Sequence, residues 1–267
     1  MTEVTPLLFL FGLAVGTFGT MLGVGGGFIH VPFLMLVFGF SAQDAVADSL
    51  AIIFLNTLTG SLNYYYQKRM DFDLAMKLAP ALLPGAIIGP LIVEKYTNSF
   101  FFVIFSAVLF VCAINLYFGR SHINLLSSDQ YNRKKTIKDI FGNTVSYSTN
   151  VELGWIGTFV IGFVSNLVGI GGGVVHVPFL ILFMKVPTHL AVGTSHLLLC
   201  ISSGVGAAMF LLLGRVNVDF TMAIGIGAVV GAPIGASLSR RSSAATIRKG
   251  LAILLVVMGI KMVFQIV

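Results

Sequence analysis

The sequence predicts an all-α integral membrane protein built from two inverted homologous repeats, each with five helical segments. Three observations predict this fold class. Hydrophobic residues make up 57% of the 267 residues and charged residues only 10%, against about 25% charged residues in a soluble domain. The apolar runs are too long for barrel strands. The chain also repeats itself at a constant offset, and its basic residues are unevenly distributed.

The repeat is clearest in a glycine-rich motif that occurs twice. Residues 23–34, Gly-Val-Gly-Gly-Gly-Phe-Ile-His-Val-Pro-Phe-Leu, match residues 169–180, Gly-Ile-Gly-Gly-Gly-Val-Val-His-Val-Pro-Phe-Leu, at nine of twelve positions and an offset of 146. Further identities at the same offset include Arg69 with Arg215. The chain therefore divides into a first half, a polar basic linker and a second half, at residues 1–118, 119–152 and 153–267.

Each half contains five apolar segments in the same order. They are about 5–23, 27–40, 44–66, 72–94 and 98–118 in the first half, and 153–169, 173–185, 188–213, 218–239 and 243–266 in the second. Segments three to five are long enough to span a bilayer, which takes about 20 helical residues. The second segment is too short and suits a half-helix. We therefore expect the first two segments to form a hairpin, broken at the glycines, that enters and leaves on one face.

The basic residues favour inverted halves. Inversion places thirteen of them on one side and three on the other, whereas parallel halves would split them ten to six. Because positive charge collects on the cytoplasmic side, the richer side is expected to be cytoplasmic, with both termini outside. The linker is expected to be a solvated cytoplasmic loop rather than a ligand site. The richer side holds Lys68, Arg69, Lys77, Arg120, Arg133, Lys134, Lys135, Lys138, Lys185, Arg240, Arg241, Arg248 and Lys249.

The two glycine triplets are the main candidates for a binding site. A helix that starts after each triplet directs its free N–H groups and positive dipole end at the break, and glycine lets an anion approach the backbone. Inversion would bring both breaks together near the midplane as one anion site. The alternative is close helix packing through small residues, which a single run would favour, whereas paired runs favour a site. The triplets are Gly25, Gly26, Gly27, Gly171, Gly172 and Gly173.

Other polar residues within the apolar segments are candidates for the same site. His30 and His176 fall one turn into each short helix, where they could bind the anion, carry a proton, or stay neutral and bond to a carbonyl. Asp48 is an acid in an apolar segment, so it is a candidate for proton coupling unless it lies near the interface. Candidate pathway liners, or else interhelical hydrogen-bonding residues, are Ser49, Asn56, Ser195 and His196.

The paired glycine motifs resemble those of the TauE/SafE family of membrane transporters, also called the sulfite exporter or DUF81 family. The resemblance covers nearly the whole chain, including its duplication and its central basic loop. That family is linked to movement of sulfite, sulfoacetate and other organosulfonates across the bacterial cytoplasmic membrane. The resemblance therefore implies a multi-pass protein of that inner membrane with a small sulfur oxyanion or organosulfonate as its substrate.

The sequence thus predicts a secondary transporter for small sulfur-containing anions that works by alternating access, since inverted repeats with interrupted helices recur in such transporters. An anion channel of the same architecture is the alternative. An enzyme is not expected, because the chain has no His-Glu-x-x-His, Cys/His cluster or Gly-x-Ser-x-Gly pattern. No catalytic residue, cofactor, metal or nucleic-acid partner is predicted; the expected partners are the anion and membrane lipid, and a homodimer is left open.

Overall fold

The structure, a computed structural model, describes residues 5–95, 98–118 and 132–263, and the side chains of some residues in α5 and α10 also lie outside the described part. The described residues form ten helices and a two-stranded antiparallel sheet. In chain order these are α1 (Thr5–Leu22), α2 (Gly27–Phe38), α3 (Ala42–Tyr66), α4 (Phe72–Val93), α5 (Asn98–Phe118), β1 (Arg133–Lys138), β2 (Thr144–Thr149), α6 (Val151–Val168), α7 (Gly173–Leu182), α8 (Thr188–Leu212), α9 (Val218–Arg241) and α10 (Ala244–Val263).

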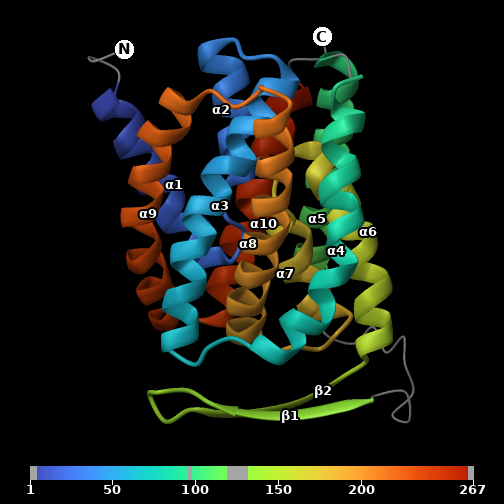
Figure 1. Ribbon diagram of the computed structural model, residues 1–267. Coiled ribbons are helices and arrows are strands. Elements are labelled where there is room, and N and C mark those ends of the chain that lie inside the picture. The colour runs from blue at the N-terminus through green and yellow to red at the C-terminus, as the bar shows by residue number, and fades with distance from the viewer. Residues whose placement is uncertain (1–4, 96–97, 119–131, 264–267) are drawn as a thin grey trace.

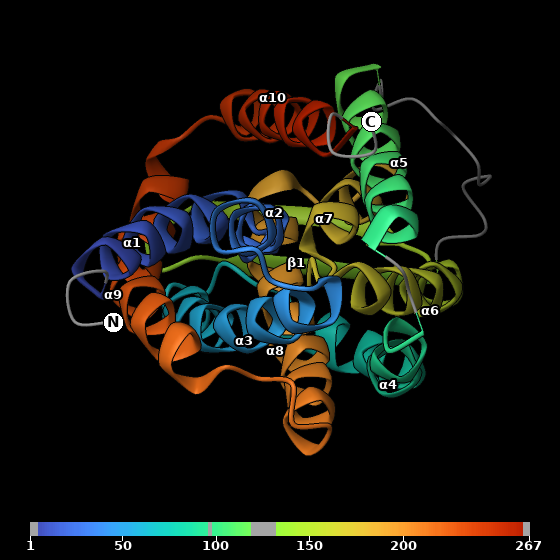
Figure 2. The same ribbon diagram turned by 90° about the horizontal axis from the view of Figure 1, so that it is seen from above.

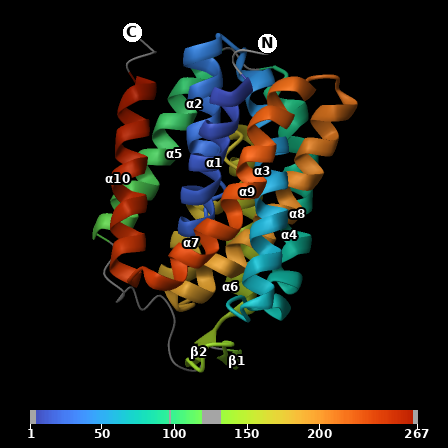
Figure 3. The same cartoon turned by 90° about the vertical axis from the view of Figure 1, so that its left-hand side faces the viewer.

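The helices form one bundle, and the sheet lies across one end of it (Figure 1). Helix α1 begins at the end opposite the sheet and α2 returns to that end, whereas α6 begins at the sheet end and α7 returns there (Figures 1 and 3). Seen along the bundle, α2, α3, α7 and α8 occupy the centre, and α5 lies beside α10 at the edge (Figure 2). The two short helices therefore lie among the longer ones.

Side-chain caps explain where four of the helices begin. The side chains of Ser41, Asp71, Asn150 and Asn217 each accept a hydrogen bond from a backbone N–H in the first turn of α3, α4, α6 and α9, respectively. These residue types satisfy N–H groups that have no partner within the helix. A cap at the equivalent position, Asp71 or Asn217, thus sets the start of the fourth helix in both halves.

Small residues allow the flanking helices to approach closely. Helix α1 packs against α9, where Gly12 lies against Ile224 and Gly16 against Ala228. Helix α6 packs against α4 in the same way, with Gly85 touching the backbone at Phe163. Close backbone approach supplies the van der Waals contact that holds helices together in lipid. The first helix of each half therefore packs against the fourth helix of the other half.

Six helices in the described part are long and apolar enough to cross a membrane, namely α1, α3, α4, α6, α8 and α9. Helices α5 and α10 have 21 and 20 residues, the length expected of a spanning segment. The short second segments are confirmed, because α2 and α7 have 12 and 10 residues. Helices α1 and α6, which the sequence analysis assigns to hairpins, also reach the length of a span, with 18 residues each. The chain is a multi-pass, mostly helical membrane protein.

The all-α prediction is wrong in the linker, where the structure has a β-hairpin. Strands β1 and β2 pair antiparallel, with Arg133 opposite Thr149 and Lys138 opposite Thr144. Alternating Thr, Val and Tyr side chains in β2 suit a strand, and Gly142 has a φ of 90°, which suits the tight turn. The solvated-loop interpretation overlooked this pattern. Residues 119–131, including Arg120, lie outside the described residues.

Candidate functional site

The two glycine motifs form sharp backbone breaks between α1 and α2 and between α6 and α7. Gly25 and Gly26 have φ angles of 74° and 92°, and Gly171 and Gly172 have φ angles of 69° and 98°. Other L-residues are strained in this left-handed region, so each break needs its glycines. Helices α2 and α7 begin at the third glycine of each triplet, and neither has a side-chain cap. Their first N–H groups point into the break without a partner within the helix.

The structure brings the two breaks into contact. A Cβ atom on Gly27 would lie 2.8 Å from the carbonyl oxygen of Gly169, and one on Gly173 would lie 2.7 Å from the carbonyl oxygen of Gly23. All six triplet glycines are buried. Close packing through small residues therefore operates here, and an anion could reach these glycines only after the two breaks separate.

Two serines hold the breaks together across the halves. Ser49 donates a hydrogen bond to the carbonyl of Gly169 at 2.8 Å, and Ser195 donates one to the carbonyl of Gly23 at 3.1 Å. Ser49 and Ser195 are equivalent at the offset of 146, as are the two glycines. Each half therefore binds the start of the break in the other half, and both serines that the sequence analysis named lie at the breaks.

Four buried polar residues, which we call the polar column, extend from the first break toward the sheet end. Asn56 donates to the carbonyl of Gly25 at 3.2 Å, and Thr20 donates to Asn56 Oδ1 at 3.1 Å. His196 Nε2 lies 3.3 Å from Thr20 Oγ1, and the Tyr64 hydroxyl donates to the carbonyl of Thr20 at 2.8 Å. The sequence analysis named Asn56 and His196 but missed Thr20 and Tyr64. Tyr64 follows Asn56 by eight residues, a helical repeat that could have revealed it.

His30 and His176 face the two breaks with unused hydrogen-bonding capacity. Both are buried, and neither has a hydrogen-bond partner within the described part of the chain. His30 Cε1 lies 3.1 Å from the position that a Cβ atom on Gly26 would take, and His176 Nδ1 lies 3.2 Å from the corresponding position on Gly172. An unpaired buried polar group costs about 1–3 kcal/mol. The interpretation of a histidine bonded to a nearby carbonyl is therefore wrong for this conformation.

Asp48 points away from the breaks. Its Oδ1 accepts a hydrogen bond from the backbone N–H of Asn217 at 2.6 Å, at the start of α9. The residue equivalent to Asp48 is Thr194, whose hydroxyl oxygen accepts from the backbone N–H of Asp71 at 2.9 Å, at the start of α4. An uncharged side chain performs the same task in the second half, so this contact does not account for the negative charge of Asp48.

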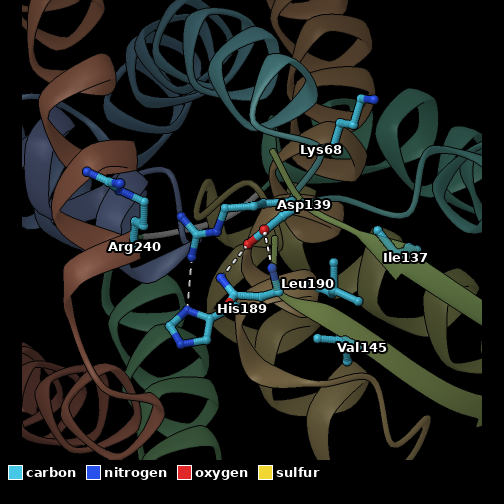
Figure 4. Close-up of a pocket in the computed structure, with 9 residues that line it drawn as sticks. Lys68, Ile137, Asp139, Val145, His189, Leu190 and Arg240 are labelled. Atoms are coloured by element: carbon cyan, nitrogen blue, oxygen red, sulfur yellow. Dashed lines mark hydrogen bonds between the residues drawn. The ribbon is translucent and has the colours of Figure 1, made fainter. Parts of the chain in front are cut away.

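A cavity lies at each end of the bundle. The one beside the sheet has a volume of about 270 Å³ and is lined in part by Arg69, His189 and Arg240 (Figure 4). The one at the opposite end has a volume of about 410 Å³ and is lined in part by Asp44 and Arg215. The sequence analysis predicted neither cavity, because the residues that line each one are far apart in the chain.

Several long apolar helices around two interrupted helices define a multi-pass membrane transporter, because broken helices at membrane depth are typical of such proteins. The chain belongs to the sulfite exporter TauE/SafE family, whose sequence profile matches residues 8–262. The predicted family is thus confirmed. Members are membrane transporters, so this protein is a transporter and not an enzyme.

Individual relatives support this membership over the full length. The chain is 28% identical over 266 residues to the probable membrane transporter protein YunE of Bacillus subtilis, covering 97% of both chains. It is 25% identical over 272 residues to the probable membrane transporter protein MJ0441 of Methanocaldococcus jannaschii, covering 96% of this chain and 94% of the relative. A 93-residue stretch is 37% identical to sulfite exporter TauE/SafE family protein 3 of Arabidopsis thaliana, covering 31% of this chain and 18% of the relative. No solved structure matches the chain.

Proposed function

We propose that this protein is a secondary transporter that moves small sulfur-containing anions, such as sulfite, sulfoacetate or related organosulfonates, across the bacterial cytoplasmic membrane by alternating access. The contact between the two glycine breaks carries the proposal, because each break is an uncapped helix N-terminus beside a histidine with no hydrogen-bond partner among the described residues. Backbone N–H groups at two helix ends can bind the oxygens of a sulfite or sulfonate group without a fixed countercharge. Such a site holds the ion weakly enough to release it.

In this proposal the anion lies between the N-termini of α2 and α7. The glycine triplets, Gly25–Gly27 and Gly171–Gly173, supply the N–H groups, and His30 and His176 supply ring nitrogens. When the breaks separate, the hydroxyl and amide groups now bonded to their carbonyls become free to line the opened space. Those groups are the hydroxyls of Ser49 and Ser195 and the amide of Asn56. His196, which follows in the polar column, would line the same space.

We also propose that residues 1–118 and 153–267 are inverted repeats, joined by the basic linker 119–152, with the sheet end facing the cytoplasm and both termini outside. Reciprocal contacts support this proposal. Ser49 in the first half bonds to the second half and Ser195 in the second half bonds to the first, and Asp48 and Thr194 form a second such pair of contacts. Reciprocity of this kind is expected from a two-fold axis that relates the halves, and the opposite directions of α1 and α6 (Figure 1) favour an axis in the membrane plane. Rocking one half against the other would open the breaks to one side at a time.

Substitution at the breaks tests the site. Purified protein in proteoliposomes is expected to take up radiolabelled sulfite, and Gly172→Ala is expected to reduce the maximal rate by about tenfold or more, because a φ of 98° strains any L-residue by about 1–2 kcal/mol. Gly26→Ala should do the same. The matched control is Gly39→Ala, since Gly39 has a φ of 67° but open space around its Cβ position. Wild-type transport by both break variants, at equal protein levels, would refute the site.

The same vesicles separate a transporter from an uncoupled anion channel. A coupled transporter accumulates sulfite against its concentration gradient when a pH gradient is imposed, whereas a channel only equilibrates it. If sulfite only equilibrates and never accumulates under any imposed ion gradient, the protein is a channel and the transporter hypothesis is wrong.

A further inference from the structure

The cavity beside the sheet, which we call the basic pocket, is lined by two arginines and a histidine from three separate parts of the chain. Arg69 follows α3, His189 lies at the start of α8, and Arg240 lies at the end of α9. In Figure 4, His189 and Arg240 lie on the same side of the pocket, whereas the ammonium end of Lys68 points away from them. Arg69 and Arg240 both line the pocket with a formal positive charge; Arg69 is buried and Arg240 is exposed.

Arg69 is buried without an ion pair. Its guanidinium donates to Gln67 Oε1 at 3.2 Å and to the carbonyl of Ala236 at 3.4 Å, and it lies 3.0 Å from His189 Nδ1. Within the described residues no carboxylate pairs with it. Burial lowers the pKa of Arg69 below its usual value, as expected when a charged group is removed from water without a full countercharge.

The equivalent arginine at the opposite end has the partners that Arg69 lacks. Arg215 donates to both carboxylate oxygens of Glu94, at 2.9 and 2.7 Å, and lies 3.5 Å from Asp44. At the offset of 146, the residue equivalent to Glu94 is Arg240, and the residue equivalent to Asp44 is Leu190. The two cavities thus share three equivalent lining positions, 68 with 214, 69 with 215 and 190 with 44. In the basic pocket, a leucine and a second arginine stand where the opposite end has its two acids.

The basic pocket also connects to the first glycine break. The guanidinium carbon of Arg69 lies 5.8 Å from the centre of the Tyr64 ring, and Tyr64 is the last member of the polar column that begins at Gly25. The residues equivalent to Tyr64 and His196 in the other half are Phe210 and Leu50. Asn166 donates to Ser202 at 2.8 Å in the other half, at the positions equivalent to Thr20 and Asn56. Among the described residues, the part of the polar path built from Tyr64 and His196 therefore leads only from the basic pocket.

The turn of the β-hairpin supplies the one acid that lines the basic pocket among the described residues, Asp139. Its carboxylate is already engaged, because it accepts from the backbone N–H groups of Phe141 and Asn143 and from Asn143 Nδ2, at 2.8–2.9 Å. Burial raises the pKa of Asp139, but these hydrogen bonds and the charge of Arg69 outweigh burial and lower the pKa overall. Arg240 lies 4.3 Å above the Phe141 ring. The turn thus covers the pocket while leaving Arg69 without a direct countercharge.

We propose that the basic pocket is an antechamber that binds the same class of small sulfur oxyanion on the sheet side before the anion reaches the breaks, an inference that rests on the transport function proposed above. Planar guanidinium groups suit it because they bind two oxygens of one oxyanion. A volume of about 270 Å³ holds a sulfite or short sulfonate with several waters, each of which occupies about 30 Å³. The anion supplies the countercharge that Arg69 lacks.

The test is a kinetic separation of the antechamber from the break site. Sulfite transport from the sheet side is measured in oriented vesicles at constant ionic strength, set with potassium chloride so that screening stays fixed. Arg240→Gln is expected to raise the KM for sulfite about tenfold, the loss expected for one hydrogen-bonded charge, with the maximal rate within twofold of wild type. The matched control is Arg241→Gln, because Arg241 is exposed on the same helix end and does not line the pocket. Arg69→Lys, which keeps the buried charge but loses the planar fork, should also raise the KM.

Binding to the break variant completes the test. Sulfite should still raise the unfolding temperature of purified Gly172→Ala protein, and this stabilisation should be lost in the double variant Gly172→Ala/Arg240→Gln. An unchanged KM in both arginine variants would overturn the antechamber, even if Gly172→Ala had lost transport and so upheld the break site. Loss of all sulfite stabilisation in Gly172→Ala alone would likewise overturn it.

Discussion

Ser49 and Ser195 show how a single hydroxyl can join the two halves of this protein. Each is buried and donates to the first glycine carbonyl of the opposite break. A glycine carbonyl at a break has no continuing helix to accept from, so its hydrogen bond must come from a side chain or water. The same two carbonyls would lose their partners whenever the breaks separate. The two serine hydrogen bonds therefore stabilise the closed form relative to the open one.

Removing either hydroxyl is expected to destabilise the closed form. Ser49→Ala or Ser195→Ala leaves a buried carbonyl unsatisfied, at a cost of about 1–3 kcal/mol, and should lower the unfolding temperature of the purified protein. Ser242→Ala is the control, because Ser242 also bonds to a backbone carbonyl, that of Leu238 at 2.9 Å, but at an exposed position. Equal unfolding temperatures for all three variants would show that the serines do not hold the breaks.

Asp48 carries a charge that its structural contact does not need. Asp48→Asn retains an oxygen that can accept from the Asn217 N–H, so the fold and the downhill flux of sulfite should be preserved. If Asp48 couples proton movement to transport, as proposed for acids within membrane segments, this variant should lose accumulation driven by a pH gradient. The control is Asp44→Asn, one helical turn earlier. If Asp48→Asn accumulates sulfite as the wild type does, Asp48 has no role in proton coupling and only accepts the hydrogen bond at the start of α9.

At the scale of elements, one ionic network fastens the β-hairpin to the bundle. The Arg133 guanidinium lies 2.8 Å from the Asp71 carboxylate and 2.9 Å from that of Asp73, and the Tyr147 hydroxyl donates to Asp71 at 2.6 Å. Burial and the Asp71 hydrogen bond raise the pKa of Tyr147, so it remains a protonated donor at physiological pH. Asp71 also caps α4 through Leu74 N–H. The sheet is thereby tied to the start of a helix rather than lying free in solvent.

Breaking this network should release the hairpin. Arg133→Gln leaves Asp71 buried without its cation, a loss of about 3 kcal/mol, at the lower end for such pairs because Asp73 is half exposed. In vesicles whose sheet side faces the added protease, trypsin should then cut the hairpin at its remaining lysines several times faster than in the wild type. Lys134→Gln is the matched control, since Lys134 is exposed on the same strand. Equal cleavage rates in both variants would mean that other contacts hold the sheet.

The helices could be predicted from the sequence because the length of each apolar run and the glycines between them are local signals. Helix α3, expected over 44–66, begins only two residues earlier. The sheet was missed because a short polar strand resembles a loop until it pairs. The contact from Ser49 to Gly169 depends on packing across 120 residues, which no local pattern contains. The same is true of the basic pocket, because the lack of an acid beside Arg69 is visible only once the helices are assembled.

At the scale of the whole molecule, similar contacts at the two ends carry different charges. Arg215 pairs with two acids at the opposite cavity, whereas the described residues of the basic pocket give Arg69 no ion pair and add Arg240. A two-fold arrangement of the helices would make the helical parts of the two ends similar, so the β-hairpin and the charges distinguish the ends. If the sheet end faces the cytoplasm, as proposed above, these arginines follow the usual distribution of positive charge in membrane proteins, and they would concentrate anions at that end.

The proposed inversion of the two halves predicts opposite accessibility for two equivalent residues. Asp73 and Asp219 are both exposed acids in the first turn of the fourth helix of their halves and are separated by the offset of 146. In a background with Cys112→Ser and Cys200→Ser, a membrane-impermeant maleimide added to intact cells should label Asp219→Cys and spare Asp73→Cys until the membrane is permeabilised. The acidic positions lie in water whichever topology holds, so poor labelling cannot come from burial in lipid. Labelling of both from the same side would establish parallel halves, and two glycine breaks approaching from one face could not then form opposite walls of a single anion site.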